Sequence, residues 1–250
     1  MIRLKNAAQI ALMKEAGRIT GEAILTAAEH IREGVSTKFL DTKIREHIEK
    51  CGAKPSFLGY GGFPASACIS INDEVIHGIP SDSRILTEGD IVKIDVGAFY
   101  KGFHGDSART FAVGSVTPEA QKLIDVTKEC FFKAIAEIKP GARVGDIGNA
   151  VQSYAEANGY GVVREYVGHG IGAELHESPE IPNFGRAGRG IRLFPGMALA
   201  IEPMINVGTW EVKRMGDGWT VKTKDGSLSA HYENTVIFTD EEIILTTVVS

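Results

Sequence analysis

Two aspartates in the middle of this chain stand where the local sequence predicts a strand and a tight turn. Asp95 follows the strand-like run 91–94, and Asp106 follows the glycine-containing turn 100–105. Side chains alternate between the faces of a strand, so a loop of two or four residues would place both carboxylates on one face of a hairpin. Taken singly, each residue also fits an ordinary role as a solvated acid or a turn cap. Buried together, the two would repel each other unless a proton or a cation lay between them.

The second half of the chain contains further groups of this kind. His169 is flanked by glycines in GHGIG, which let the backbone turn closely around its imidazole. Glu202 lies in MALAIEPMINVG, which predicts one buried strand. The next two strands predict a pair that turns at Asp225-Gly226 and places His231 and Glu233 on one face.

These acids and the histidine cannot be buried together without cations. Carboxylates with one imidazole suit hard or borderline divalent metals, and bridging carboxylates can hold two such ions roughly 3.5–4 Å apart. The wide spacing of Cys51, Cys68 and Cys130 does not support a structural zinc site built from cysteines. The residues predicted to bind metal are Asp95, Asp106, His169, Glu202 and Glu233.

Composition indicates a globular protein without a nucleic-acid or membrane partner. The net charge of -5 provides no basic field for nucleic acid or an anionic membrane. No apolar run approaches the roughly 18 residues of a membrane span, and charged residues interrupt the N-terminal segment, which argues against a signal peptide. The 3 unpatterned cysteines favour a reducing compartment, so we predict a cytoplasmic protein.

Two helices precede the strands in each half of the chain. Apolar residues from Ile10 to Ile31 predict a long helix, and a second helix follows with Ser36 or Thr37 as its cap. Thr117-Pro118 predicts the start of an equivalent pair. Helices followed by strands that return as hairpins are typical of an α+β domain.

The two halves align at one offset, which favours a duplication over chance. We therefore predict one domain, 1–250, built from an internal repeat of approximately 10–113 and 117–240, with its site between the halves. Gly34 and Gly141 differ by 107 positions (141 minus 34), and the same offset relates Gly52 to Gly159, Leu86 to Leu193, Gly89 to Gly196, Ile94 to Ile201 and Asp95 to Glu202.

Four segments carry a resemblance to a known family that covers essentially the whole chain. IDVGAFYKGFHGDSART, GHGIGAELHE, AIEPMI and HYENT together resemble the type I methionine aminopeptidases. The resemblance implies a single catalytic domain with the pita-bread fold, in which two pseudo-twofold related α/β halves surround a central curved antiparallel sheet. It also implies a monomeric hydrolase that removes the initiator methionine from nascent chains at the ribosome when the second residue is small.

The family further implies roles for the predicted metal ligands. Two divalent ions, of cobalt, manganese, iron or zinc, would be bridged by Asp106 and Glu233. Asp95 would bind one ion, and His169 with Glu202 would complete the other. A metal-activated water would attack the carbonyl of the first residue, with Glu202 as the general base.

Substrate contacts are implied by the same resemblance. His176 corresponds to a histidine that stabilises the tetrahedral intermediate, and His77 to one that contacts the scissile amide. Leu175 stands where an aromatic residue is common in the family, and Phe57 where a smaller cysteine can occur, which leaves the preference among first residues open. The methionine side chain would be held by residues that also fit ordinary core packing, namely Phe57, Tyr60, Phe63, Cys68 and Trp219.

Two other functions are consistent with parts of this pattern. X-Pro aminopeptidases and prolidases of the same fold share the metal ligands but usually carry an additional N-terminal domain, for which the helical pattern from Ile10 leaves no room. A catalytically silent relative that binds ribosomes or nascent chains would be expected to have lost part of the ligand set. The complete ligand set argues against the silent relative, and the helical pattern from Ile10 argues against the X-Pro enzymes.

Overall fold

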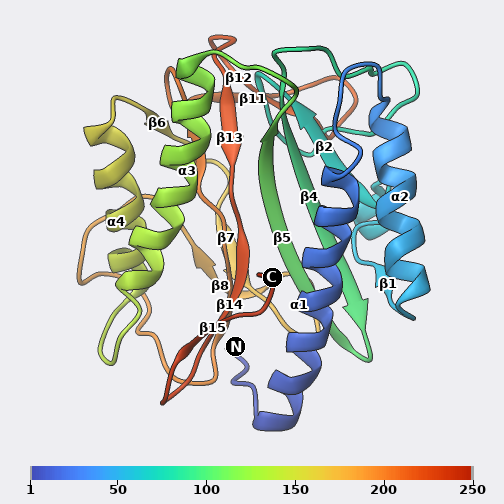
Figure 1. Ribbon diagram of the computed structural model, residues 1–250. Coiled ribbons are helices and arrows are strands. Elements are labelled where there is room, and N and C mark those ends of the chain that lie inside the picture. Colours follow the sequence, from blue (N-terminus) through green and yellow to red (C-terminus); the bar gives the residue numbers. More distant parts are fainter. Residues whose placement is uncertain (1, 249–250) are drawn as a thin grey trace.

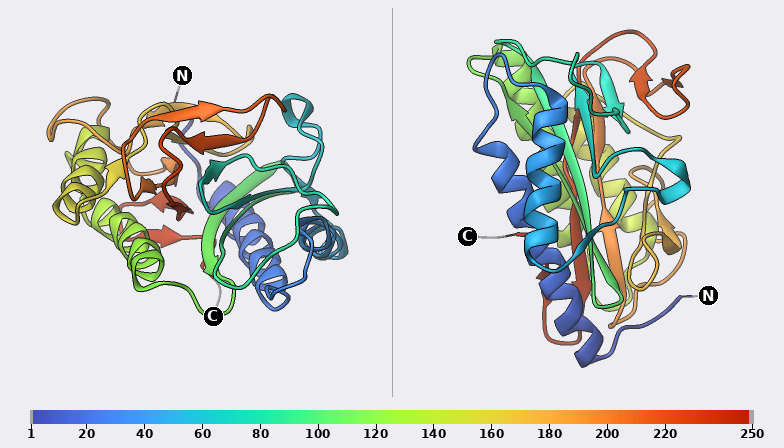
Figure 2. Two further views of the ribbon diagram at one scale, coloured as in Figure 1. Left: turned by 90° about the horizontal axis from the view of Figure 1, so that it is seen from above. Right: turned by 90° about the vertical axis from the view of Figure 1, so that its right-hand side faces the viewer.

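The computed structural model describes residues 2–248, which form two pairs of helices packed against antiparallel strands. The first pair is α1 (Ala7–Ala28) and α2 (Thr37–Lys50), and the second is α3 (Pro118–Ala136) and α4 (Val144–Ala157). Figure 1 shows one pair on each flank of the strands, and Figure 2 shows that both pairs cover the same outer side. Within residues 2–248, no helix has the length and apolar character needed to cross a bilayer.

Side-chain caps fix where the helices begin, as the sequence predicts. Ser36 Oγ accepts a hydrogen bond from the Phe39 N–H at 3.1 Å, and Thr117 caps α3 in the same way. The prediction that the first helix reaches Ile31 is wrong, because α1 ends at Ala28. The chain tightens there into single turns, with the Ile31 N–H donating to Ala28 O at 3.1 Å.

The predicted hairpin is formed by β4 (Ile91–Tyr100) and β5 (Phe103–Ala112). Its turn is the two-residue loop Lys101-Gly102, with φ of 46° and 93°, a left-handed pair that matches the twist of the strands. The register places Asp95 and Asp106 on one face, which confirms the parity argument. Both strands are longer than predicted, so Asp95 lies within β4 and β5 begins before Asp106.

Every strand pair in the described residues is antiparallel, and the strands belong to four sheets. A short 3-10 helix (Tyr60–Gly62) lies in the loop before β2. The β4–β5 hairpin pairs with β1 (Lys54–Pro55) and β2 (Ala67–Ile71), and the other sheets follow the orders β11 (Val212–Arg214), β12 (Val221–Thr223), β3 (Glu74–Ile76); β13 (Ser229–His231), β10 (Met204–Asn206), β6 (Gly161–Val162); and β15 (Ile243–Leu245), β14 (Asn234–Phe238), β9 (Ala198–Ile201), β7 (Gly168–Gly170), β8 (Glu177–Ile181).

Two expectations for the C-terminal strands are wrong. The segment around Glu202 is not one strand but two, β9 and β10, in different sheets, because Pro203 has no N–H with which to continue the ladder. The strands flanking Asp225-Gly226 also separate, since β12 pairs with β3 and β11 whereas β13 pairs with β10. His231 and Glu233 still point to the same side, with His231 Nε2 4.0 Å from Glu233 Oε2.

The two halves share local geometry at the offset read from the sequence. Isolated backbone bridges join Ser36 to Ile85 and Arg143 to Arg192, and both members of the second bridge follow the first by 107 positions (143 minus 36, 192 minus 85). The corresponding glycines adopt left-handed backbone angles that favour glycine, with φ of 84° and 91° at Gly34 and Gly141, and 92° and 90° at Gly89 and Gly196.

The halves meet where β5 runs beside the start of β14. The Glu233 N–H donates to Ala108 O at 2.9 Å, and the Asp106 N–H donates to Thr235 Oγ1 at 2.9 Å. Ser107 Oγ also donates to Glu233 O at 2.7 Å. These bonds bring the carboxylates of Asp106 and Glu233, far apart in the sequence, to one place.

Candidate metal centre

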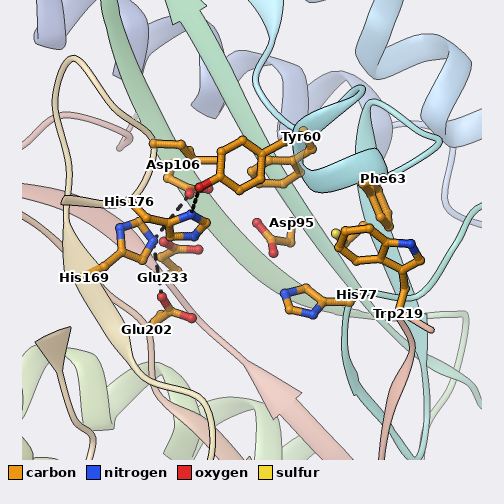
Figure 3. A pocket seen from close by; sticks show the side chains of 13 residues that line it. Tyr60, Phe63, His77, Asp95, Asp106, His169, His176, Glu202, Trp219 and Glu233 are labelled. Atoms are coloured by element: carbon orange, nitrogen blue, oxygen red, sulfur yellow. Dashed lines mark hydrogen bonds and ion pairs between the residues drawn. The ribbon is translucent and has the colours of Figure 1, made fainter. Parts of the chain in front are cut away.

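One pocket brings together every residue that the sequence assigned to metal, catalysis or substrate (Figure 3). Figure 3 shows Asp106, His169, Glu202 and Glu233 grouped on one side and Phe63 and Trp219 on the other, with Asp95 between them. The pocket is lined by Phe57, Tyr60, Phe63, Cys68, His77, Asp95, Asp106, His169, Leu175, His176, Glu202, Trp219 and Glu233.

Asp95 and Asp106 enter the pocket from the β4–β5 hairpin. The Oδ1 atom of each is buried and has no hydrogen-bond partner among residues 2–248. Burial raises the pKa of Asp95 to about 7. Burial, and after it the nearby carboxylates of Asp95 and Glu202, raises the pKa of Asp106 well above its ordinary value. Buried carboxylates without hydrogen-bond partners raise the free energy of the folded chain. A bound cation would lower it.

His169 is presented by β7 with one ring nitrogen facing the acids. Its Nδ1 lies 2.9 Å from Gly170 O and must be the donor, because a carbonyl only accepts. Burial lowers the pKa of His169 to about 3, so the ring is neutral and Nε2 carries a lone pair. That atom lies 3.6 Å from Glu202 Oε1 and 3.8 Å from Asp106 Oδ2, which are also acceptors. These three acceptor atoms lie close enough together to bind one cation.

Glu202 and Glu233 complete the acidic side. Burial is the main cause that raises the pKa of both carboxyls well above their ordinary values, and neighbouring carboxylates add to it. Glu233 is 2% exposed, and its Oε1 has no hydrogen-bond partner in the described chain. Its backbone is fixed by Arg109, whose guanidinium donates to Glu233 O and, at 2.6 Å, to Asn234 Oδ1.

The donor set fits divalent cations. Ligand atoms of Asp106, His169 and Glu233 all lie within 4.8 Å of one another. Asp95 and Glu202 line the same pocket and supply further oxygens. An oxygen-rich set with one imidazole suits manganese, iron, cobalt or zinc better than it suits a thiolate-preferring ion.

His231 belongs to this centre, although sequence reasoning gave it no role. It ends β13, is 2% exposed, and has both ring nitrogens buried without a hydrogen-bond partner in residues 2–248. Its Nε2 lies 3.6 Å from Glu202 Oε2. The signal available in the sequence was the alternation that places His231 on the same face as Glu233.

Two further histidines flank the acids. His77 is half-buried, and its partial removal from water lowers its pKa to about 4, so its imidazole is neutral near pH 7. His176 lies on the exposed side, where its Nδ1 is 2.7 Å from the Tyr60 hydroxyl. Its ring packs against that of His169 with centroids 4.3 Å apart. Both histidines therefore stand beside the acids with ring positions set by neighbours.

Aromatic side chains form the other side of the pocket. Phe63 and Trp219 pack edge to face with ring centroids 5.1 Å apart, and Trp219 also lies near His77 at 6.5 Å. Phe57 is buried, and so is Cys68, whose thiol pKa is raised well above its ordinary value by burial. This side offers apolar surface and no charged group.

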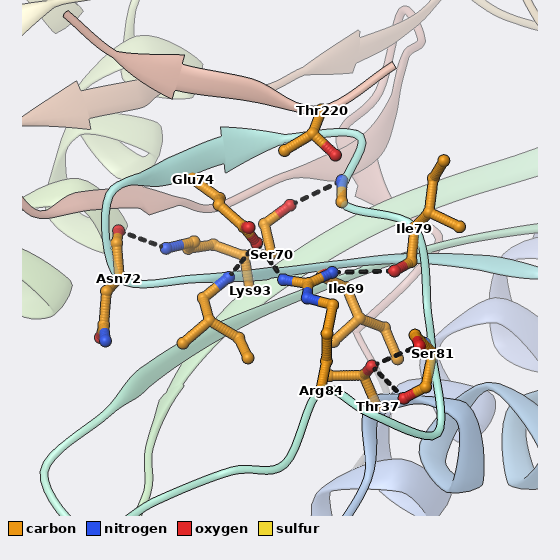
Figure 4. Close-up of polar contacts among 12 residues, drawn as sticks. Thr37, Ile69, Ser70, Asn72, Glu74, Ile79, Ser81, Arg84, Lys93 and Thr220 are labelled. Atoms are coloured by element: carbon orange, nitrogen blue, oxygen red, sulfur yellow. Dashed lines mark hydrogen bonds and ion pairs between the residues drawn. The ribbon is translucent and has the colours of Figure 1, made fainter. Parts of the chain in front are cut away.

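Polar contacts fix the loop that presents His77 (Figure 4). His77 has φ of 59°, which is uncommon for a residue other than glycine. Arg84, farther along the same loop, donates to Ile79 O at 2.8 Å and forms an ion pair with Glu74. The guanidinium thereby ties both sides of the His77 loop together, which supports the unusual backbone conformation.

A second group with metal-ligand atoms lies away from the pocket, between α1 and α2. It consists of Glu22, His47 and Cys51, which are all half-buried. The His47 Nε2 atom lies 3.3 Å from Glu22 Oε2, and Arg18 also pairs with Glu22. The contact between His47 and Glu22 across the helices and the ion pair of Glu22 with Arg18 explain this group.

The chain resembles known peptidases over nearly its whole length. The profile of metallopeptidase family M24 matches residues 11–240. The methionine aminopeptidase of Clostridium acetobutylicum is 56% identical over 240 residues, which cover 96% of each chain. Methionine aminopeptidase 1 of Bacillus subtilis is 49% identical over 240 residues, again covering 96% of each chain.

This chain belongs to metallopeptidase family M24. The crystal structure of methionine aminopeptidase from Thermotoga maritima matches it with a TM-score of 0.97 and 44% identity, over 99% of both chains. Prolidase from Pyrococcus furiosus matches with a TM-score of 0.80 and 25% identity, over 99% of this chain but 66% of the prolidase. The pita-bread fold and the resemblance to methionine aminopeptidases, both predicted from the sequence, are confirmed.

Proposed function

We propose that this M24 protein is a methionine aminopeptidase that removes the initiator methionine from nascent chains whose second residue is small. The pocket is the observation that supports this most. Buried carboxylates and His169 line one side, while an aromatic surface suited to a flexible thioether faces them. A substrate whose first side chain enters the apolar part would present its first carbonyl to the acidic part.

The acidic side would hold divalent cations, and we propose two, of cobalt, manganese, iron or zinc. When bound, such cations supply Lewis acidity and lower the pKa of water toward neutrality. The unpartnered oxygens of Asp95, Asp106 and Glu233 support this assignment, since each has a free electron pair directed into a buried site. The proposed ligands are Asp95, Asp106, His169, Glu202 and Glu233.

Three residues would act on the substrate. Glu202, at the break between β9 and β10, would take a proton from the attacking water and pass it to the leaving amine. His176 would donate from Nε2 to the carbonyl oxygen as it becomes negative, because the Tyr60 hydroxyl at 2.7 Å can donate to Nδ1. His77 would contact the scissile amide from its fixed loop.

The methionine side chain would occupy the aromatic part of the pocket. The edge-to-face packing of Phe63 and Trp219 holds both rings in place. Leu175, which is 2% exposed, adds an aliphatic surface beside them. The proposed lining is Phe57, Tyr60, Phe63, Cys68 and Trp219.

A panel of peptides tests the proposed function. Purified protein is freed of metal, reconstituted separately with manganese, cobalt, iron and zinc, and assayed on Met-Ala-Ser, Met-Leu-Ser, Ala-Pro and Ala-Ala-Ser. We expect release of methionine from Met-Ala-Ser and little from Met-Leu-Ser. Preferential cleavage of Ala-Pro would instead favour a prolidase-like activity. No cleavage of any peptide with any metal would favour a binding protein.

We further propose that 1–250 acts as one catalytic domain of two related halves, monomeric and cytoplasmic, on nascent chains at the ribosome. The shared bridges and glycine conformations of the halves support the internal repeat. Light scattering after size exclusion tests the monomer. Co-sedimentation with translating ribosomes, with and without a methionine-bearing nascent chain, tests the partner.

A further inference from the structure

His231 is the buried polar side chain of the centre that the proposed function leaves unused. Its backbone is fixed on both sides by Thr110, whose Oγ1 accepts from the His231 N–H at 3.0 Å and donates to His231 O at 2.9 Å. The ring is 2% exposed, and neither nitrogen has a hydrogen-bond partner in residues 2–248. Because buried polar groups are normally paired, an imidazole held this firmly needs a partner nearby.

The carboxylate of Glu202 can become that partner, because a small shift would bring it within hydrogen-bond distance of the ring. Its carboxylate lies between two imidazoles, with Oε1 3.6 Å from His169 Nε2 and Oε2 3.6 Å from His231 Nε2. The two rings differ, because His169 uses Nδ1 to donate to Gly170 O and so faces Glu202 with a lone pair. His231 has no such commitment at Nδ1, so its Nε2 is free to carry the hydrogen.

We propose that His231 is a positioning residue that donates an Nε2–H hydrogen bond to Glu202 Oε2. This bond would hold the carboxylate so that Oε1 stays directed, with His169, toward the cation and the substrate. The inference rests on the proposed function for its importance in catalysis, but the proposed hydrogen bond involves only residues of this chain. Groups behind metal ligands commonly change metal affinity by about 10–100-fold when they are removed.

Metal affinity tests the proposal without relying on turnover. Mn²⁺ is titrated calorimetrically into metal-free wild type, His231→Gln and His231→Leu. Gln keeps an N–H donor of similar reach, whereas Leu keeps the volume without a donor. We expect His231→Leu to weaken Mn²⁺ binding by about 10–100-fold and His231→Gln to stay within about threefold of wild type. Should His231→Leu not fold, His231→Asn, whose amide is shorter, replaces it.

A second substitution shows whether the effect passes through Glu202. In a Glu202→Ala background there is no carboxylate to orient, so His231→Leu should change Mn²⁺ affinity by less than about threefold. Ser229→Ala, in the same strand, is the control for a general disturbance of β13, and it should bind Mn²⁺ as wild type does. Histidine ¹⁵N spectra of the wild type should show His231 protonated on Nε2 and bare on Nδ1.

Three results would overturn the proposal: unchanged Mn²⁺ affinity in His231→Leu, an equal loss in the Glu202→Ala background, or a proton on Nδ1 instead of Nε2. In the peptide assay, we expect His231→Leu to lower kcat more than it raises KM. If wild type released no methionine at all, the proposed function would fail while the Mn²⁺ titrations still decided the role of His231.

Discussion

His169 Nε2 and Glu202 Oε1 lie 3.6 Å apart and face each other as two hydrogen-bond acceptors. The arrangement follows from the bond between His169 Nδ1 and Gly170 O, which leaves Nε2 without a hydrogen. Two acceptors at this separation repel each other unless a proton or a cation lies between them. The folded chain is therefore prepared for a cation before it binds one.

Metal binding should raise the thermal stability of the metal-free protein. At a free metal concentration about 100 times Kd, binding contributes about 2.7 kcal/mol, which for a chain of this size raises Tm by roughly 5–10 °C. Differential scanning calorimetry with and without Mn²⁺ measures this. Cys51→Ser, which alters the second group between α1 and α2, should show the same rise. An undiminished rise in Asp106→Asn would place the bound metal elsewhere.

Glu202→Gln should lower kcat by about 10²–10⁴-fold while the protein stays folded, because the amide cannot accept a proton. Peptide turnover and circular dichroism measure the two effects. The metal-free variant should be at least as stable as wild type, since a buried carboxylate beside other acids has been removed. Glu180→Gln, an exposed change on β8, serves as the control. Full activity of Glu202→Gln would exclude Glu202 as the base.

His176 and Tyr60 should contribute unequally to the same step. His176→Ala removes the proposed donor to the carbonyl oxygen and should lower kcat by roughly 10²–10³-fold. Tyr60→Phe removes the 2.7 Å hydrogen bond to His176 Nδ1 but keeps the ring, so about a tenfold loss is expected. Steady-state kinetics on Met-Ala-Ser compare the two. A larger effect for Tyr60→Phe would show that Tyr60 itself contacts the reacting atoms.

His77 should make stability depend on pH. Its pKa falls to about 4 in the folded protein, from 6.5 for a free histidine, so the unfolded chain binds more protons between these values. Stability is therefore lost as pH falls from 6.5 toward 4, by up to about 3 kcal/mol from this residue. Urea unfolding of the metal-free protein at several pH values should show a shallower loss in His77→Gln. An equally steep loss would assign the dependence to other groups.

Gly105→Ala should destabilise the fold beside the metal centre. A Cβ at Gly105 would lie 2.7 Å from Gly17 N in the backbone of α1, so the helix could not pack as closely on β5. Overpacking of this kind costs about 1–3 kcal/mol. Gly216→Ala, where a Cβ meets no atom within 4 Å, is the matched control and should unfold like wild type. If Gly105→Ala and Gly216→Ala were equally stable in urea, α1 would be able to shift without cost.

Local sequence rules predicted how the first half of the chain contributes to the site. Parity along a two-residue hairpin puts Asp95 and Asp106 on one face whatever the rest of the chain does. Ser36 and Thr117 mark helix starts because their side-chain oxygens accept from the first turn. The predicted helix ends were less accurate, because the conformation of the turn near Ile31 depends on the path of the loop that follows it.

The amino-acid sequence by itself determined which side chains are available for metal and how neighbours along one strand are oriented. The tertiary structure decided which strands pair, and therefore that Glu202 lies at a break before Pro203 and that β12 and β13 join different sheets. It also placed His231 behind Glu202. The packing of whole sheet faces against each other decides which distant strands pair. Periodicity in the sequence indicates only which residues of one strand share a face.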